Sequence, residues 1–179
     1  GTIIFAGVPL SIKLFGNGKG KPAENIWKGL PTLSELIIKL SIIGVIYIIV
    51  YFVFGYFVAW QVQDLRVFYS GHPEDKGFVS VLANNLHQNP VIFPFQFLRG
   101  VLFGLFVLPL ATMFKEQSRI FLISLILVFL SPGMGLIIPT FLFPDTVRWA
   151  HFVEMISSMF VFAVIVWFVY DKLKLNSSK

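Results

Sequence analysis

The sequence predicts an all-α integral membrane protein: a bundle of four transmembrane helices with a truncated or interfacial fifth segment at the N-terminus. Two observations carry this prediction. Of the 179 residues, 56% are hydrophobic and only 13% are charged, whereas soluble domains are about 45–50% apolar and about 25% charged. Four stretches are also long and apolar enough to cross a bilayer, which takes about 20 residues. A soluble fold of this length could not bury so much apolar surface, which excludes a soluble enzyme, a disordered chain and a nucleic-acid-binding module.

The N-terminal region, residues 1–39, is expected to be an interfacial segment followed by a cytoplasmic loop. Its apolar stretch 2–15 is too short to span a membrane, and residues 16–29 are rich in Gly and Lys. Thr32 and Glu35 have the spacing of a capping box, in which a hydroxyl accepts a backbone N–H bond at the start of a helix. We therefore expect the first long helix to begin near Leu33.

The transmembrane bundle is assigned to residues 40–170, and a cytoplasmic tail to residues 171–179. The predicted helices cover about residues 40–63, 91–114, 120–143 and 147–170. Between the first two lies a polar loop, 64–90, predicted to face outward. Within it four apolar residues recur at helical spacing, which indicates a short amphipathic helix on the membrane surface: Phe78, Val81, Leu82 and Leu86.

Small residues and a proline mark two special positions within the helices. Gly100 and Gly104 form a G-x-x-x-G pattern, which lets helix backbones approach closely, so this face is expected to pack against another helix. Pro132, with Gly133 and Gly135, should weaken the third helix, because proline removes a backbone donor and glycine has low helix propensity. We expect an ordinary kink there, or a hinge that faces a ligand.

The distribution of Lys and Arg predicts the orientation. Four of the 14 fall on the side of the 64–90 loop, and ten fall on the side of both ends of the bundle. Since cytoplasmic loops carry the excess of Lys and Arg, the 16–39 loop and the tail are placed in the cytoplasm. The expected location is a bacterial-type inner or plasma membrane. The net charge of +5 is attributed to orientation and anionic lipid heads rather than to nucleic acid.

Two charged residues lie deep inside predicted spans. Arg99 and Glu154 each sit roughly 10–12 Å along their helices from the outer ends. Charges at such depth usually face the bundle interior and pair, so we expect the two to be close in space. His151 and Arg148 share the helix face of Glu154, and three further polar residues lie near the same level: Gln96, Gln61 and Asp64.

Three interpretations of this polar cluster remain open. The first is a structural ion pair that fixes helix register. The second is an outward-open pocket for a small polar or anionic ligand or a lipid head, anchored by Arg99. The third is an intramembrane enzyme or proton relay that uses His151 and Glu154.

The remaining motifs favour a non-enzymatic role. There is no cysteine, no zinc, nucleophile-elbow or phosphate-loop motif, and too few ligands at suitable spacing for a metal. We therefore expect no cofactor, no metal and no catalytic residue. The sequence favours a structural or accessory subunit of a membrane complex, with the lipid bilayer and other membrane subunits, or further copies of itself, as partners.

Overall fold

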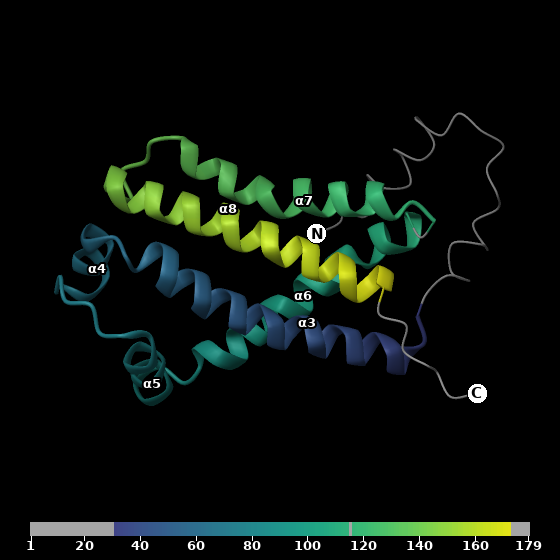
Figure 1. Cartoon of the computed structure of the whole chain (residues 1–179), viewed down its shortest axis with the longest axis horizontal. Coiled ribbons are helices and arrows are strands. Elements are labelled where there is room, and N and C mark those ends of the chain that lie inside the picture. Colours follow the sequence, from purple (N-terminus) through teal and green to yellow (C-terminus); the bar gives the residue numbers. More distant parts are fainter. Residues whose placement is uncertain (1–30, 115, 173–179) are drawn as a thin grey trace. The chain divides into compact units, whose positions relative to one another are not determined.

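Figure 1 shows the computed structural model, which describes residues 31–114 and 116–172. In these ranges the chain is all-helical and contains four helices long and apolar enough to cross a membrane, as the sequence predicted. The expected N-terminal interfacial segment, the 16–30 part of its loop and most of the tail lie outside the described residues.

The helices follow one another with two short ones between the first and second long ones (Figure 1). In chain order they are α3 (Leu33–Phe54) continued by the π-helix η1 (Gly55–Ala59), α4 (Gln63–Ser70), α5 (Phe78–Gln88), α6 (Ile92–Met113), α7 (Ser118–Met134) continued by the 3₁₀ turn η2 (Gly135–Ile137), and α8 (Asp145–Trp167) continued by the π turn η3 (Phe168–Lys172). The predicted surface helix in the polar loop thus corresponds to α5.

Helix α3 begins where the capping pattern places its start. The Thr32 hydroxyl accepts a hydrogen bond from the backbone N–H of Glu35 at 3.3 Å. The Glu35 carboxylate does not complete a capping box, because it forms an ion pair with Lys39 at 2.9 Å. The cap therefore provides an acceptor for one of the backbone N–H groups in the first turn that have none within the helix.

The four long helices pack as two pairs. Helix α3 packs mainly against α6, α7 runs beside α8, and α8 also contacts α3 (Figure 1). The α3–α6 crossing is tight, since a Cβ built on Gly100 would lie 2.6 Å from the Cβ of Tyr47 and 2.9 Å from the Cα of Gly44. Gly104 lies on the same face, against Leu40. Dispersion contacts between closely packed backbones stabilise such crossings in an apolar solvent.

Aromatic side chains fill the centre between the two helix pairs. Tyr47, Phe103, Phe129 and Phe162 come from the four different long helices, and their rings contact one another mostly edge-to-face, with centroids 5.0–6.1 Å apart. These geometries suit the quadrupoles of aromatic rings. Side chains from all four long helices therefore meet at this level of the bundle.

The third long helix differs from its predicted extent. It continues through Pro132 but stops at Ile137 rather than near residue 143. Proline at 132 cannot donate to the carbonyl of Val128, and the Ser131 hydroxyl donates to that carbonyl instead, at 2.8 Å. The helix therefore survives its proline and ends at the 3₁₀ turn that begins at Gly135.

Candidate functional site

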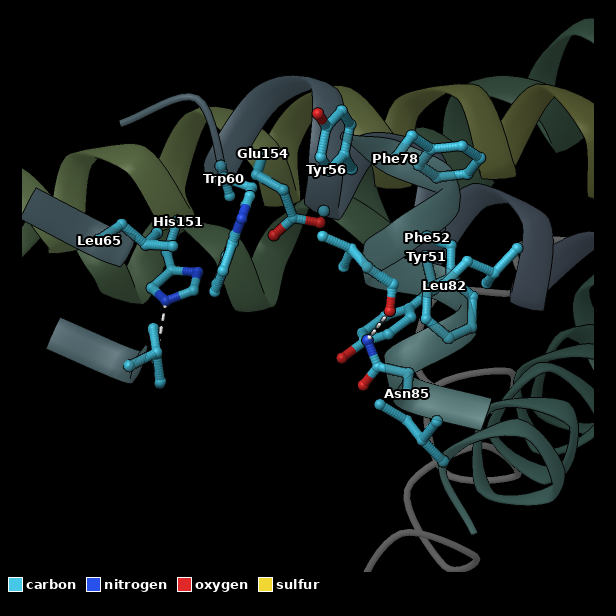
Figure 2. A pocket seen from close by; sticks show the side chains of 15 residues that line it. Tyr51, Phe52, Tyr56, Trp60, Leu65, Phe78, Leu82, Asn85, His151 and Glu154 are labelled. Atoms are coloured by element: carbon cyan, nitrogen blue, oxygen red, sulfur yellow. Dashed lines mark hydrogen bonds between the residues drawn. The ribbon is translucent and has the colours of Figure 1, made fainter. Parts of the chain in front are cut away.

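A pocket lies at the end of the bundle that carries α4 and α5 (Figure 2). Its volume is about 410 Å³. The last turns of α3, the π-helix η1, the short helices α4 and α5, and α8 supply most of the lining side chains. Small-molecule sites in proteins are typically concave, mostly apolar and roughly 300–1,000 Å³ in volume, so this pocket has the size and location of a binding site.

Aromatic side chains make up much of the pocket lining. Six rings contribute: Tyr51, Phe52, Tyr56, Trp60, Tyr69 and Phe78. Polar groups in the lining include Glu154 and His151 from α8 and Asn85 from α5. Helix α5 packs onto this wall through Phe78, whose ring lies 5.3 Å from Tyr56 and 5.4 Å from Phe57, centroid to centroid.

The π-helix η1 shapes one wall of the pocket. Its wider turn is marked by the backbone N–H of Trp60, which donates to the carbonyl of Gly55 at 2.8 Å. Side chains satisfy two of the carbonyls at the end of the helix. Gln61 donates to the carbonyl of Tyr56 at 2.9 Å, and Arg66 to that of Trp60 at 2.7 Å. Single π-turns of this kind are frequent at functional sites.

Glu154 and Trp60 are the polar centre of the pocket. In Figure 2 the indole of Trp60 stands between the His151 ring and the Glu154 carboxylate. The indole Nε1 is buried and has no hydrogen-bond acceptor in residues 31–114 or 116–172. Buried donors normally have a partner, so Trp60 brings an unsatisfied donor to the lining of the pocket.

Tyr69 and His151 join α4 to α8 at the edge of the pocket. The Tyr69 hydroxyl and the His151 Nε2 are 2.9 Å apart, and the rings of Tyr69 and Phe143 each meet the imidazole edge-on. Burial, with a smaller contribution from Tyr51, raises the pKa of Tyr69 above its ordinary value. The hydroxyl therefore keeps its proton at neutral pH and remains a hydrogen-bonding group.

The structure does not form the expected ion pair between Arg99 and Glu154. The two interact electrostatically, but no guanidinium nitrogen lies within 4.0 Å of the carboxylate. Arg99 instead donates to Gln96 at 3.2 Å, and its Cζ lies 5.5 Å from the centroid of the Tyr47 ring. Neither Arg99 nor Gln96 lines the pocket. The reason is that Arg99 faces the α3–α6 interface, where an aromatic face and an amide already accommodate it.

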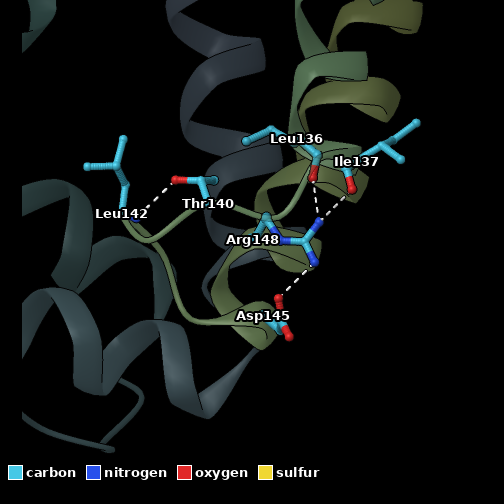
Figure 3. Close-up of polar contacts among 6 residues, drawn as sticks. All are labelled: Leu136, Ile137, Thr140, Leu142, Asp145 and Arg148. Atoms are coloured by element: carbon cyan, nitrogen blue, oxygen red, sulfur yellow. Dashed lines mark hydrogen bonds and ion pairs between the residues drawn. The ribbon is translucent and has the colours of Figure 1, made fainter.

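Arg148 lies apart from the pocket and closes the end of the third long helix (Figure 3). Its side chain is buried and donates to the carbonyls of Leu136 and Ile137 at 2.8 and 2.9 Å. Its other terminal nitrogen pairs with Asp145 at 2.8 Å. These bonds satisfy helix-terminal carbonyls that would otherwise have no partner, so Arg148 acts as a structural cap.

The other residues predicted for the site have local roles. Asp64 is exposed in the first turn of α4, where a carboxylate complements the positive end of the helix dipole. Pro132 and Gly135 do not line the pocket, and Gly133 packs against α8, where an added Cβ would lie 3.0 Å from Ile156. Of the predicted cluster, the pocket therefore gathers His151 and Glu154.

The aromatic wall was missed by sequence reasoning. Phe78 was predicted as part of a surface helix, and Trp60 and Tyr69 are not among the predicted site residues. A usable signal was present: aromatic residues at positions 51, 52, 56 and 60 follow the last turns of the first span, at the depth of Glu154. No group of three or more potential metal ligands occurs among residues 31–114 and 116–172.

The fold and pocket define a broad class: an all-helical protein with four helices long and apolar enough to cross a membrane and a pocket at one end of the bundle. Comparison with protein-family models, curated proteins and solved structures finds no match to this chain.

Proposed function

We propose that this chain is an integral membrane protein that binds a small amphipathic ligand, or the polar head of a lipid, in the pocket beside Glu154. The observation that carries the proposal is the pocket itself, about 410 Å³ in volume, with an aromatic wall and a carboxylate. Pockets that combine an apolar lining with a few convergent polar groups are the usual form of ligand sites.

Membrane insertion is supported by the outward faces of the long helices. Large apolar side chains are exposed along all four of them, among them Ile49, Phe106, Leu127 and Phe160. In water such a surface would drive aggregation, whereas the bilayer solvates it. The pocket lies at the end of the bundle that the Lys and Arg distribution places outside, so the proposed site opens to the extracytoplasmic side.

The structural-subunit role favoured by the sequence is the weaker proposal. It required Arg99 and Glu154 to satisfy each other, and they form no direct ion pair. The enzyme alternative is weaker still, because the His151 Nε2 is already engaged by Tyr69 and a catalytic base must reach a proton of its substrate. A binding site needs only the cavity and its lining groups.

A pocket-filling variant tests the proposal. Gly55 lines the pocket, and a Cβ there meets no atom within 4 Å, so Gly55→Leu adds bulk to the cavity without a clash at the Cβ. Gly135→Leu is the matched control, since its Cβ is equally unobstructed and it lies outside the lining.

The measurement is native mass spectrometry of each protein extracted from its own membrane in mild detergent. We expect a bound small molecule or lipid on the wild type and on Gly135→Leu, and its loss from Gly55→Leu. Equal retention by all three proteins, or a bare wild-type chain, would contradict the proposal. A stoichiometric protein partner on a bare chain would support the accessory-subunit alternative.

A further inference from the structure

We propose that the ligand presents an ammonium group to this pocket, seated between the Glu154 carboxylate and the aromatic wall, together with a neighbouring oxygen that accepts from Trp60. The inference rests on the proposed function and names the chemical class of its ligand. Amino alcohols and their esters, such as choline or ethanolamine and the lipids built on them, carry both groups close together.

The charge of the lining favours a cation. Among the described residues that line the pocket, Glu154 is acidic and none is Lys or Arg. Arg99, a basic group that interacts electrostatically with Glu154, donates to Gln96 and lies over the Tyr47 ring. A carboxylate that lacks an ion-pair partner within 4.0 Å leaves an unfilled site for a positive charge carried by the ligand.

The aromatic wall adds a second attraction for the same group. The face of an aromatic ring carries negative potential, and Trp and Tyr attract cations most strongly. Cages of such rings are a recurring means of binding quaternary ammonium ions. Here Trp60, Tyr51 and Tyr56 line the cavity together with Glu154, and in Figure 2 the Glu154 carboxylate lies between Trp60 and Tyr56.

The buried indole N–H of Trp60 indicates which chemical group of the ligand lies next to its ammonium group. Trp60 Nε1 has no acceptor among the described residues, and leaving a buried donor unpaired is unfavourable. Because the Nε1 atom is enclosed, the indole turns toward the cavity when a hydroxyl, ester or phosphate oxygen of the ligand accepts this hydrogen bond. An anionic ligand without an ammonium group would gain the same bond but would meet the carboxylate of Glu154, which argues against the anion expected from Arg99.

A pair of isosteric probes tests the charge directly. Choline and 3,3-dimethylbutan-1-ol have the same shape and hydroxyl group, and differ in that choline carries a quaternary nitrogen where the alcohol carries carbon. Binding of each to the purified full chain in nanodiscs is measured by isothermal titration calorimetry. We expect choline to bind about tenfold more tightly or better, the combined effect of the carboxylate and the rings.

Variants of the protein test which residues cause the preference for choline over the alcohol. Glu154→Gln keeps the side-chain size and should reduce the preference for choline to the part contributed by the aromatic rings, while leaving the affinity for the alcohol unchanged. Asp64→Asn removes an exposed carboxylate outside the pocket and should leave both affinities unchanged. Trp60→Phe keeps a ring but removes the N–H, and should weaken both probes, choline more than the alcohol because Phe attracts a cation less strongly than Trp.

An experiment with lipid nanodiscs distinguishes a lipid head group from a free solute as the ligand. The same proteins are reconstituted in nanodiscs that contain phosphatidylcholine and phosphatidylglycerol in equal amounts, and retained lipid is identified by native mass spectrometry. Selective retention of phosphatidylcholine that Glu154→Gln reduces, without binding of choline, assigns the site to a lipid head. Choline binding without lipid selectivity assigns it to a solute.

Two results overturn the inference and can be told apart. In the first, a ligand is lost from Gly55→Leu, but the protein prefers neither choline over 3,3-dimethylbutan-1-ol nor phosphatidylcholine over phosphatidylglycerol. The pocket then binds ligands, and the cation inference is wrong. If no ligand or probe binds and Gly55→Leu matches the wild type, the proposed function itself fails.

Discussion

Gly100→Ala should destabilise the bundle, although alanine is the better helix former. The added Cβ would lie 2.6 Å from the Tyr47 Cβ, 2.9 Å from the Gly44 Cα and 3.1 Å from the Ile43 carbonyl oxygen. Carbon atoms prefer separations of about 3.5–4.0 Å, so α3 and α6 must move apart by roughly 1 Å. Because none of these atoms can rotate away, we take the upper end of the overpacking cost, about 3 kcal/mol.

The helix propensity of alanine offsets about 1 kcal/mol of this cost, which leaves a net loss of about 2 kcal/mol in the free energy of unfolding. The assay is reversible unfolding by sodium dodecyl sulfate in mixed micelles, followed by far-ultraviolet circular dichroism. Gly135→Ala is the control, since its Cβ meets no atom within 4 Å, and it should be neutral or stabilising. A Gly100→Ala protein as stable as Gly135→Ala would refute the close approach of the two helices.

Two further predictions concern the polar contacts of Arg148 and Tyr69. Arg148→Leu should cost about 1–3 kcal/mol of unfolding free energy, because the carbonyls of Leu136 and Ile137 lose their donor in a partly buried position; a stability equal to that of the wild type in the same detergent titration would refute the capping role. Tyr69→Phe should make the free energy of unfolding depend less steeply on pH in the alkaline range. The pKa of Tyr69 is raised in the folded protein from its ordinary value of 10.0, so its contribution is complete below pH 10 and is lost as the pH rises through the folded-state pKa. Titrating stability between pH 8 and 12 checks this, and identical slopes for the two proteins would contradict the raised pKa of Tyr69 in the folded protein.

The hydropathy of continuous segments was sufficient to predict the four long helices. Each has an apolar stretch that nothing but a membrane-spanning or deeply buried helix accommodates, and local chemistry at Thr32 placed the start of the first one. The helix in the polar loop was likewise predictable, because Phe78, Val81, Leu82 and Leu86 recur at helical spacing. These features depend on residues close together in the chain.

The partners of the buried charges depend on contacts that sequence spacing does not report. Depth along the helices put Arg99 and Glu154 at one level, but it carried no information on which way each faces. Rotation about the helix axis directs Arg99 toward Tyr47 and Gln96 and Glu154 toward the pocket. Arg148 was grouped with Glu154 by the same helix face, yet its length lets it reach the carbonyls that end the third helix.

The shape of the pocket was not predicted, because it depends on an irregular backbone. Tyr56 and Trp60, four residues apart, share a face in a regular helix, and the π-helix at residues 55–59 changes the phase of the side chains that follow it. The residues that satisfy its carbonyls, Gln61 and Arg66, are ordinary polar residues in the sequence. Their role became visible once the backbone was known.

Photo-crosslinking from inside the pocket tests the central claim most directly. Leu82 lines the pocket, while Leu86, one turn further along α5, does not line it and is 56% exposed. A diazirine-bearing aliphatic residue is placed at either position, the protein is irradiated in its native membrane, and adducts are identified by mass spectrometry. We predict a distinct ammonium-containing adduct at position 82 and bulk membrane lipids at position 86. The same adducts in the same proportions at both positions would contradict a ligand site in this pocket.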